Sequence, residues 1–447
     1  MIIENIAAIA TPLGIGGIGI IRVSGVSCIE AVNKFLKKSI LNQEANTIKL
    51  NYFLNNEEII DEVMISVFKG PRSFTGEDSV EINCHGGIYV TNKILEILLQ
   101  DDNIRLANPG EFSQRAYING KKNLIELETA LNIIESKTEN AYAINNFNTL
   151  DNTKKKLLLI KEELLDIIGQ IEVKLDYPEY TDIKEINDSD CLIKLHDLKN
   201  QIAKIIEDSN KGQLIINGLK TVIIGAPNAG KSSLLNCLAK QNKAIVSDIR
   251  GTTRDIVETE VNLGKIVLHL LDTAGIHKTE EIIESLGIEK SLALIDEAQL
   301  ILLVIDVNEN ISEEIYQIYE KNQEKILVIL NKCDDNKKHT KHLNNEISIS
   351  VKNNYNIELI QEEILLKFNL NDDLKQQPIV TSVYQIAKLL NVKENLELAI
   401  INLENELDID LVNIDLKNAL YELGEILNTN VKSDILNHLF SNYCLGK

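Results

Sequence analysis

The sequence predicts a multidomain protein that combines α/β and all-α parts, and three observations support this fold class. At 447 residues the chain is longer than one ordinary core, since domains typically hold about 100 to 200 residues. Short Ile- and Val-rich runs alternate with amphipathic ones from Thr221 to Lys352, which is typical of a mostly parallel sheet with crossover helices. Leucines and isoleucines at helical spacing occupy the flanking stretches, Leu124 to about Ser209 and Val383 to Phe440.

The order of these stretches predicts how the domains are arranged. Residues 1–120 are glycine-rich and carry strand-like runs such as "DEVMISVFKG" and "DSVEINCHGG", which predict a separate α+β domain. We expect one discontinuous helical domain from residues 121–213 and 375–447, with the α/β domain, residues 214–374, inserted into it. "GIGGIG", Gly14 to Gly19, satisfies G-x-G-x-x-G, but the next residues, "IIRVSG", indicate a strand rather than the helix that a dinucleotide site requires.

Composition bounds the class of protein. A net charge of −21 argues against a general nucleic-acid coat, because sequence-independent affinity comes from cations that neutralise phosphates, although a local basic groove stays open. Before Arg22 there is no Lys or Arg to form a signal peptide, and apolar runs such as "LILLVI" are too short to span a membrane. The six cysteines show no C-x-x-C pair, so neither a zinc site nor a disulfide framework is indicated. We expect a soluble, cytoplasmic protein.

The run "GAPNAGKS", Gly225 to Ser232, has the context of a phosphate-binding P-loop. It follows the apolar run "TVII" and opens the helical run "SLLNCLAK". Glycines let successive backbone N–H groups point at phosphate oxygens, Lys231 adds a positive charge, and Ser232 offers a hydroxyl to Mg²⁺. The candidate nucleotide contacts here are Asn228, Ala229, Gly230, Lys231, Ser232 and Ser233.

Three later motifs identify the nucleotide as GTP. "DTAG" can hold Mg²⁺ through its carboxylate and meet the γ-phosphate through a backbone N–H. In "NKCD", the Asp334 carboxylate can accept hydrogen bonds from guanine N1–H and its 2-amino group, which adenine does not offer; a site built on such polar pairs rejects the wrong base by roughly 10⁴- to 10⁵-fold. "SVK" can close over the base. The candidate residues are Asp272, Thr273, Ala274, Gly275, Asn331, Lys332, Asp334, Ser350 and Lys352.

The residue that activates water is not obvious from these motifs. Ile276 follows "DTAG", where Ras-like enzymes carry a glutamine, and an aliphatic side chain cannot orient water. Asn228 can coordinate a monovalent cation beside the phosphates, or it is a turn former. Glu284 can polarise water as a general base or through a bridging water, or it is a solvated helix carboxylate.

Cys444 stands four places from the carboxyl end, where a prenylated cysteine would be. The last residue, Lys447, is not one that prenylation boxes use. An incidental cysteine, half of a disulfide and a working thiol remain, and a reducing cytosol disfavours the disulfide.

Taken together, the sequence resembles the MnmE (TrmE) family of tRNA-modification GTPases. The resemblance rests on "ATPLGIGGIGIIRVSG", "SFTGEDSVEINCHGG", "NPGEFSQRAYINGK", the GTPase motifs with "SDIRGTTRD", and the terminal "YCLGK". It implies an N-terminal domain that dimerises and binds a 5-formyltetrahydrofolate-type cofactor, a helical domain in two segments, and an inserted Ras-like G domain. It also implies a potassium-stimulated GTPase that, with the flavoprotein MnmG in a heterotetramer or larger complex, modifies carbon 5 of the wobble uridine of tRNA with an aminomethyl or carboxymethylaminomethyl group.

The same resemblance assigns roles to residues. It places folate binding on Arg22, Glu81 and Lys121, potassium on Asn228, Ser247, Ile249 and Thr252, and Mg²⁺ on Ser232 and Thr253. It makes Glu284 the catalytic carboxylate and Cys444 a thiol presented towards the modification chemistry. The rival hypothesis is a ribosome-assembly or RNA-binding GTPase switch without modification chemistry. The acidic, helical tail after residue 375 favours the enzyme over such an RNA-binding module.

Overall fold

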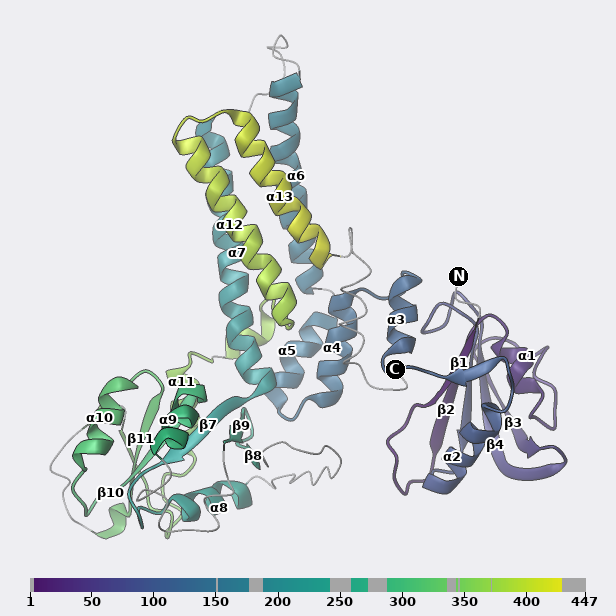
Figure 1. Ribbon diagram of the computed structural model, residues 1–447, viewed down its shortest axis with the longest axis horizontal. Coiled ribbons are helices and arrows are strands. Elements are labelled where there is room, and N and C mark those ends of the chain that lie inside the picture. Colours follow the sequence, from purple (N-terminus) through teal and green to yellow (C-terminus); the bar gives the residue numbers. More distant parts are fainter. Residues whose placement is uncertain are drawn as a thin grey trace. The chain divides into compact units, whose positions relative to one another are not determined.

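The structure, a computed structural model, describes residues 4–149, 152–176, 188–241, 259–271, 288–335, 343–344, 346–370 and 372–427. The chain divides into two compact units (Figure 1). One comprises Met1–Leu127 and Leu423–Lys447, and the other Glu128–Glu422. Mixed sheets and long helices confirm the predicted multidomain α/β and α fold class.

The N-terminal unit is built on one six-stranded sheet with strand order β3-β4-β5-β2-β1-β6. Its pairs are antiparallel except for the parallel pair of β1 with β6. The strands are β1 (Asn5–Ile9), β2 (Gly19–Ser24), β3 (Thr47–Asn55), β4 (Glu58–Phe68), β5 (Ser79–Cys84) and β6 (Ile104–Leu106). The helices are α1 (Cys28–Asn33), α2 (Ile88–Leu98) and α3 (Glu111–Ile118). The strand β2 confirms that "GIGGIG" precedes a strand and not a helix.

Side chains along these strands alternate between the two faces of the sheet. Ile21 and Val23 on β2, and Val80 and Ile82 on β5, are fully buried in the core. Burial of one such side chain stabilises the fold by about 1.5–3 kcal/mol. Because successive strand residues point to opposite faces, Arg22 lies on the face away from this core. The register of β2 on β5 then sets Glu81 directly opposite Arg22.

The second unit contains another six-stranded sheet, with strand order β12-β11-β10-β7-β9-β8. Its pairs are parallel except for β8 with β9, which confirms the predicted mostly parallel sheet. Strand β8 lies antiparallel at its edge, which the sequence analysis did not predict. The strands are β7 (Leu219–Ile224), β8 (Thr259–Asn262), β9 (Val267–Leu270), β10 (Leu300–Asp306), β11 (Ile326–Asn331) and β12 (Glu346–Ser348). The helices are α8 (Lys231–Gln241), α9 (Ile288–Glu297), α10 (Glu313–Lys321), α11 (Leu359–Lys367) and the 3₁₀ turns η1 (Cys333–Asp335) and η2 (Asp372–Gln376).

The parallel strands bring the predicted nucleotide motifs to one edge of this sheet. The phosphate loop follows β7, "NKCD" begins with the last residue of β11, and Ser350 follows β12. Parallel strands present their carboxyl ends at a common edge, where ligands of open α/β sheets bind. Strands β10 and β11 are buried throughout, which explains their unbroken apolar sequences.

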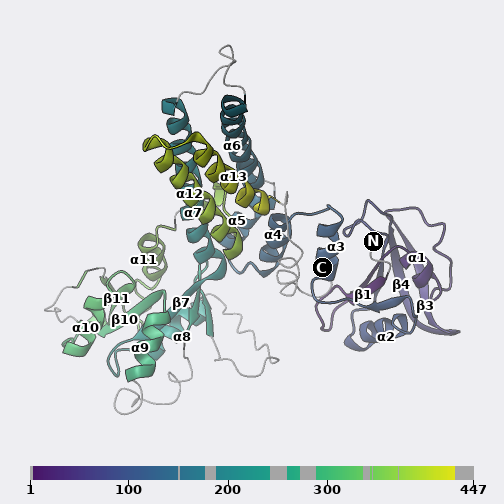
Figure 2. The ribbon, with the colours of Figure 1, turned by 45° about the horizontal axis from the view of Figure 1, so that its top comes forward.

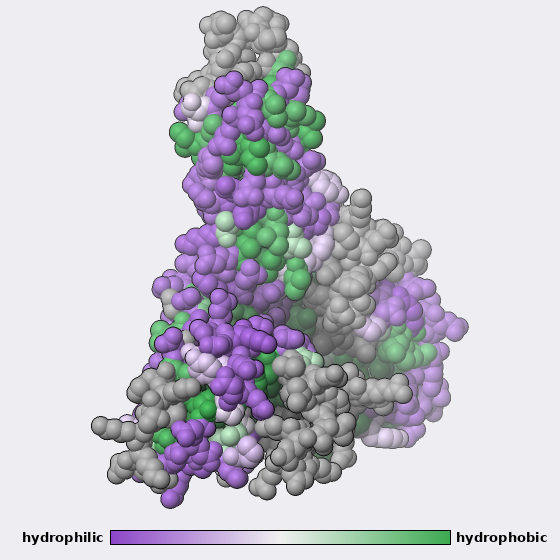
Figure 3. Space-filling view, turned by 60° about the vertical axis from the view of Figure 1, so that its left-hand side comes forward, coloured by the Kyte–Doolittle hydropathy of each residue, from purple (hydrophilic) through white to green (hydrophobic). Residues whose placement is uncertain are grey.

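The long helices come from the parts of the sequence before and after the inserted sheet. They are α4 (Leu124–Glu135), α5 (Glu139–Thr149), α6 (Asn152–Asp176), α7 (Asp188–Asn217), α12 (Val383–Glu404) and α13 (Ile409–Ile426). Helices α7 and α12 lie side by side in both ribbon views (Figures 1 and 2). The face in Figure 3 carries apolar patches between polar side chains along this helical part. Helices from the two sequence segments therefore pack against each other.

Candidate functional site

The P-loop has the backbone that its glycines predict. It joins β7 to α8, and its Gly225 and Gly230 have φ values of 148° and 96°. A Cβ on Gly225 would lie 2.0 Å from the carbonyl oxygen of Val304, and one on Gly230 would lie 2.2 Å from Nδ2 of Asn331. Only glycine fits at either position, because a side chain would meet both a steric clash and an unfavourable backbone.

Three polar residues where this loop enters α8 are placed to meet phosphates or cations. Nζ of Lys231 donates to the carbonyl oxygens of Gly225 and Ala226, at 2.8 Å each. Burial lowers the pKa of Lys231, and a phosphate brought to this position would favour its charged form. Ser232 and Ser233 are exposed in the first turn of α8, where backbone N–H groups favour anions.

Asn228 is exposed at the tip of the loop and has a left-handed backbone, with φ of 63°. Its amide is accessible, and an amide oxygen suits a monovalent cation. The structure thus places one of the four residues predicted to bind potassium, and Ser232 as one of the two predicted for Mg²⁺, in accessible positions. The described part of the chain holds no cluster of His, Cys, Asp and Glu that could bind a metal by itself.

Asn331 connects the P-loop to the "SVK" loop. Its Nδ2 donates to the carbonyl oxygen of Ala229 at 2.9 Å, and its Oδ1 accepts from the backbone N–H of Val351 at 3.2 Å. The side chain is 3% exposed. Its amide therefore holds the P-loop and the "SVK" loop together, which sequence reasoning, having assigned Asn331 simply to nucleotide binding, did not reveal.

Asp334, shortly after β11, is held as a carboxylate. Its Oδ1 accepts from Oγ of Ser350 at 2.7 Å, and this hydrogen bond lowers the pKa of Asp334. Lys352 is exposed nearby and its charge lowers the pKa further. An ionised, accessible carboxylate is the acceptor that guanine N1–H and its 2-amino group require.

Lys332 and Asp306 form a pair that sequence reasoning missed. Lys332 has a φ of 66°, and its Nζ lies 2.6 Å from Oδ2 of Asp306 at the end of β10. Burial alone would raise the pKa of Asp306, but the hydrogen bonds from Lys332 and Asn308, together with the charge of Lys332, outweigh it and the pKa is lowered. The signal was present in the sequence as an acidic residue that ends the apolar run "LILLVID".

The other predicted nucleotide, metal and catalytic residues lie outside the described residues. They are Ser247, Ile249, Thr252, Thr253, Asp272, Thr273, Ala274, Gly275, Glu284 and Cys444.

The N-terminal unit brings the predicted folate residues around one short loop. NH2 of Arg22 lies 2.8 Å from Oε1 of Glu81, and both side chains are about one-fifth exposed, at 20% and 21%. The Arg22 guanidinium lies 5.4 Å from the ring centre of Phe74 and 5.8 Å from that of Phe112. An ion pair flanked by aromatic rings can bind a planar, polar heterocycle by stacking and by hydrogen bonds.

Lys121 lies on the other side of the same loop. A Cβ on Gly76, whose φ is 81°, would lie 2.9 Å from Cγ of Lys121, so the lysine stem passes directly over this glycine. The Lys121 side chain is exposed and available to an anion. The loop from Phe74 to Gly76 thus contacts Arg22 through Phe74 and Lys121 through Gly76.

Buried charges hold this loop in place. Arg115 is 1% exposed, and its NH1 lies 3.0 Å from Oε2 of Glu77, directly after Gly76. Its NH2 lies 2.9 Å from Oε1 of Glu111, which also pairs with Arg105 at 2.6 Å. Burial alone would raise the pKa of Glu111, but hydrogen bonds led by that from Arg105 lower it to about 2. Sequence analysis missed these residues, although Glu77 lies in "SFTGED" and both Glu111 and Arg115 lie in "NPGEFSQRAY".

Comparison with known proteins covers the whole chain. A family described as "GTP-binding protein TrmE N-terminus" matches residues 5–121, and one described as "MnmE helical domain" matches residues 124–444. No helix in the described part of the chain is long and apolar enough to cross a membrane.

Curated relatives are similar from end to end. The tRNA modification GTPase MnmE of Aster yellows witches'-broom phytoplasma is 41% identical over 100% of both chains. The protein of the same name from Acholeplasma laidlawii is 40% identical over 99% of both, and that from Lactobacillus gasseri is 38% identical over 99% of this chain and 98% of its own. Matches of this length and identity, together with the two family matches, show that this chain belongs to the MnmE family of tRNA modification GTPases.

Proposed function

We propose that this chain is a potassium-stimulated GTPase that acts with an MnmG-like flavoprotein on the wobble uridine of tRNA. The reaction adds an aminomethyl or carboxymethylaminomethyl group to carbon 5, with a one-carbon unit derived from a 5-formyltetrahydrofolate-type folate. The protein acts in the cytoplasm as a homodimer, within a heterotetramer or larger complex with the flavoprotein. The observation that carries the proposal is one chain with two kinds of site: a guanine-type nucleotide site joined by Asn331, and an Arg22–Glu81 pair between aromatic rings.

The geometry of the P-loop, Asn331 and Asp334 supports nucleotide binding. The P-loop N–H groups and Lys231 bind the phosphates, and the Asp334 carboxylate accepts from the guanine edge. Bound Mg²⁺ supplies charge neutralisation at the phosphates, and Ser232 and Thr253 hold it. Since Asn331 ties both halves of the site together, binding of the base also fixes the phosphate loop.

Hydrolysis depends on residues beyond the phosphate loop. Asn228, Ser247, Ile249 and Thr252 would hold potassium, which would supply the positive charge that an arginine finger gives other GTPases. Glu284 takes a proton from the attacking water, directly or through a bridging water. Asp272 and Gly275 position Mg²⁺ and the γ-phosphate, respectively.

The folate site serves the modification rather than GTP hydrolysis. Arg22 and Glu81 offer a donor and an acceptor to the pterin edge, and the exposed ring of Phe74 borders it, while the buried ring of Phe112 supports Arg22 from behind. Lys121 binds a carboxylate of the glutamate tail. Cys444 presents a thiol to the modification chemistry, so Cys444→Ser should keep GTPase activity and lose the modified nucleoside. Retention of both would assign that cysteine to packing.

Mass spectrometry of tRNA nucleosides tests the proposal as a whole. Cells that lack this protein should lose a C5-modified wobble uridine, and the wild-type chain should restore it. A variant with Lys231→Ala, which cannot hold the phosphates, should not restore it. An unchanged nucleoside profile, with altered ribosome subunit assembly, would instead support a GTPase switch without modification chemistry.

A further inference from the structure

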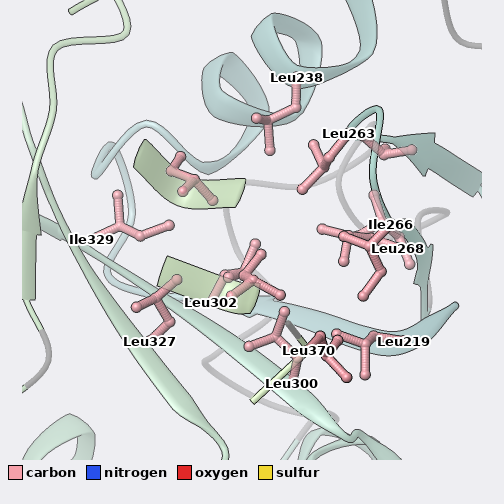
Figure 4. Close-up of a cluster of buried hydrophobic side chains, with 14 of the residues drawn as sticks. Leu219, Leu238, Leu263, Ile266, Leu268, Leu300, Leu302, Leu327, Ile329 and Leu370 are labelled. Carbon is pink, nitrogen blue, oxygen red and sulfur yellow. The ribbon is translucent and has the colours of Figure 1, made fainter. Parts of the chain in front are cut away.

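The β8–β9 hairpin belongs to the hydrophobic core that the inserted sheet shares with the helical part. Figure 4 shows Leu263, Ile266 and Leu268 of this hairpin turned towards the leucines of β7 and β10. The same core includes apolar side chains of α5 and α7. The hairpin contributes Val261, Leu263, Ile266 and Leu268, and the helices contribute Ala141, Ile144 and Ile215.

Polar contacts attach the hairpin to the turn between α4 and α5. Nζ of Lys137 lies 2.5 and 2.6 Å from the two carboxylate oxygens of Glu260 on β8. Nδ2 of Asn262 donates to the carbonyl oxygen of Lys137 at 2.7 Å. Side chain and backbone of one helical-domain residue thus contact the same short strand.

A second attachment joins β9 to the end of α7. His269 lies opposite Glu260 in the hairpin register, and its Nε2 is 2.7 Å from the carbonyl oxygen of Asn217. A carbonyl oxygen only accepts, so Nε2 carries the proton, and Nδ1 then lies 3.6 Å from Oε1 of Glu260. A Cβ on Gly218, whose φ is 75°, would lie 2.7 Å from Nε2, so glycine is needed for this close approach.

The hairpin is continuous in the chain with two segments that carry residues proposed to act in GTP hydrolysis. Strand β8 follows the segment with Thr252 and Thr253, and β9 leads through Leu271 into Asp272. Strand β9 pairs with both β8 and β7, so the contacts of Lys137 and His269 hold the hairpin from which both segments continue in the sequence. We propose that Lys137 and His269 are positioning residues, through which the helical domain sets the two segments that respond to the γ-phosphate. The inference rests on the roles proposed above for Thr253 and Asp272.

Kinetics of the full-length protein test this inference. Lys137→Met and His269→Ala should lower kcat for GTP by about three- to ten-fold and leave KM within two-fold, because Lys231, Asn331 and Asp334 are untouched. His269→Gln, which keeps a donor at the position of Nε2, should retain most of the activity. Parental kcat in both Lys137→Met and His269→Ala would overturn the proposal.

A charge exchange separates positioning from general stability. Lys137→Glu and Glu260→Lys should each lower kcat. The double variant should recover at least half of the parental value, because the exchanged pair restores the attraction between the two positions. The matched control exchanges Lys417 and Glu172, whose ion pair of 2.5 Å joins α13 to α6 away from the hairpin. That exchange should leave kcat unchanged.

Two results of the exchange experiment would refute the positioning role. In one, the double variant stays as slow as the single variants although thermal unfolding shows all of them folded. In the other, the Lys417–Glu172 exchange lowers kcat as much. Both results are read from GTP kinetics. Failure of the proposed modification chemistry would instead be read from the tRNA nucleosides, with GTP kinetics unaffected, so the two failures can be told apart.

Discussion

Replacement of Asn331 by alanine is the sharpest test of how the nucleotide site is assembled. This amide donates to the Ala229 carbonyl at 2.9 Å and accepts from the Val351 N–H at 3.2 Å. Asn331→Ala removes both bonds without adding charge or bulk. The P-loop and the "SVK" loop then lose their common polar tether.

The expected loss of nucleotide affinity follows from the burial of the Ala229 carbonyl and the Val351 N–H, which lose their hydrogen-bond partner. Ala229 is 0% exposed, so its unpaired carbonyl costs about 1–3 kcal/mol. Val351 is half-buried, so water satisfies its N–H in part and its contribution is at the lower end of that range. The total of about 2–4 kcal/mol destabilises the nucleotide-free protein as well, so it sets the upper limit of the loss on binding, and the affinity for GDP and GTP falls by up to about 1,000-fold.

Titration of a fluorescent guanine nucleotide into the full-length variant measures this loss. Thermal unfolding of the same sample shows whether the variant is folded. Asn322→Ala is the control, because its Nδ2 bonds only the Ile318 carbonyl at 3.0 Å, at the end of α10. Parental nucleotide affinity in Asn331→Ala would refute the role of Asn331 as a tether, and an equal loss in the control would show that the effect is not specific.

Four further predictions concern the other parts of the molecule. Because the pKa of Glu111 is about 2 in the folded protein and 4.5 without its partners, its ionisation stabilises the fold by about 3 kcal/mol above pH 5, and this stabilisation is lost as the pH falls to 2. Glu111→Gln should therefore be less stable at pH 7 and should show a flatter dependence of stability on pH between 5 and 2. An unchanged acid-unfolding curve would contradict the assignment. GTP turnover in KCl should exceed that in NaCl at least ten-fold, whereas equal rates would exclude a potassium site at Asn228. Glu284→Ala should bind GTP as before with turnover at least a hundred-fold lower, and retained turnover would remove its catalytic role. Calorimetric titration with a formylated tetrahydrofolate should detect binding to the parent and to Lys93→Ala but not to Arg22→Ala; absence of heat with the parent would refute folate binding.

Local patterns in the sequence were sufficient for much of the fold and for the GTP-type motifs. Unbroken apolar runs predicted the buried parallel strands, since strands covered on both faces exclude polar residues. The glycines of "GAPNAGKS" predicted the P-loop, because positive φ and close backbone approach leave few alternatives. The resemblance of the motifs predicted the family, which the full-length relatives confirmed.

What only the tertiary structure decided are the contacts between residues far apart in the chain. Asn331 was predicted to bind nucleotide, but its link to Ala229 depends on the order of β7, β10 and β11 in the sheet. In the same way, Arg115 reaches Glu77, and Lys137 reaches Glu260, through folding alone. The spacing of residues in the sequence predicts local geometry, such as helices, strands and loops. The pairing of distant side chains is set by strand order and helix packing, which minimise exposed apolar surface over the whole chain and leave no local pattern.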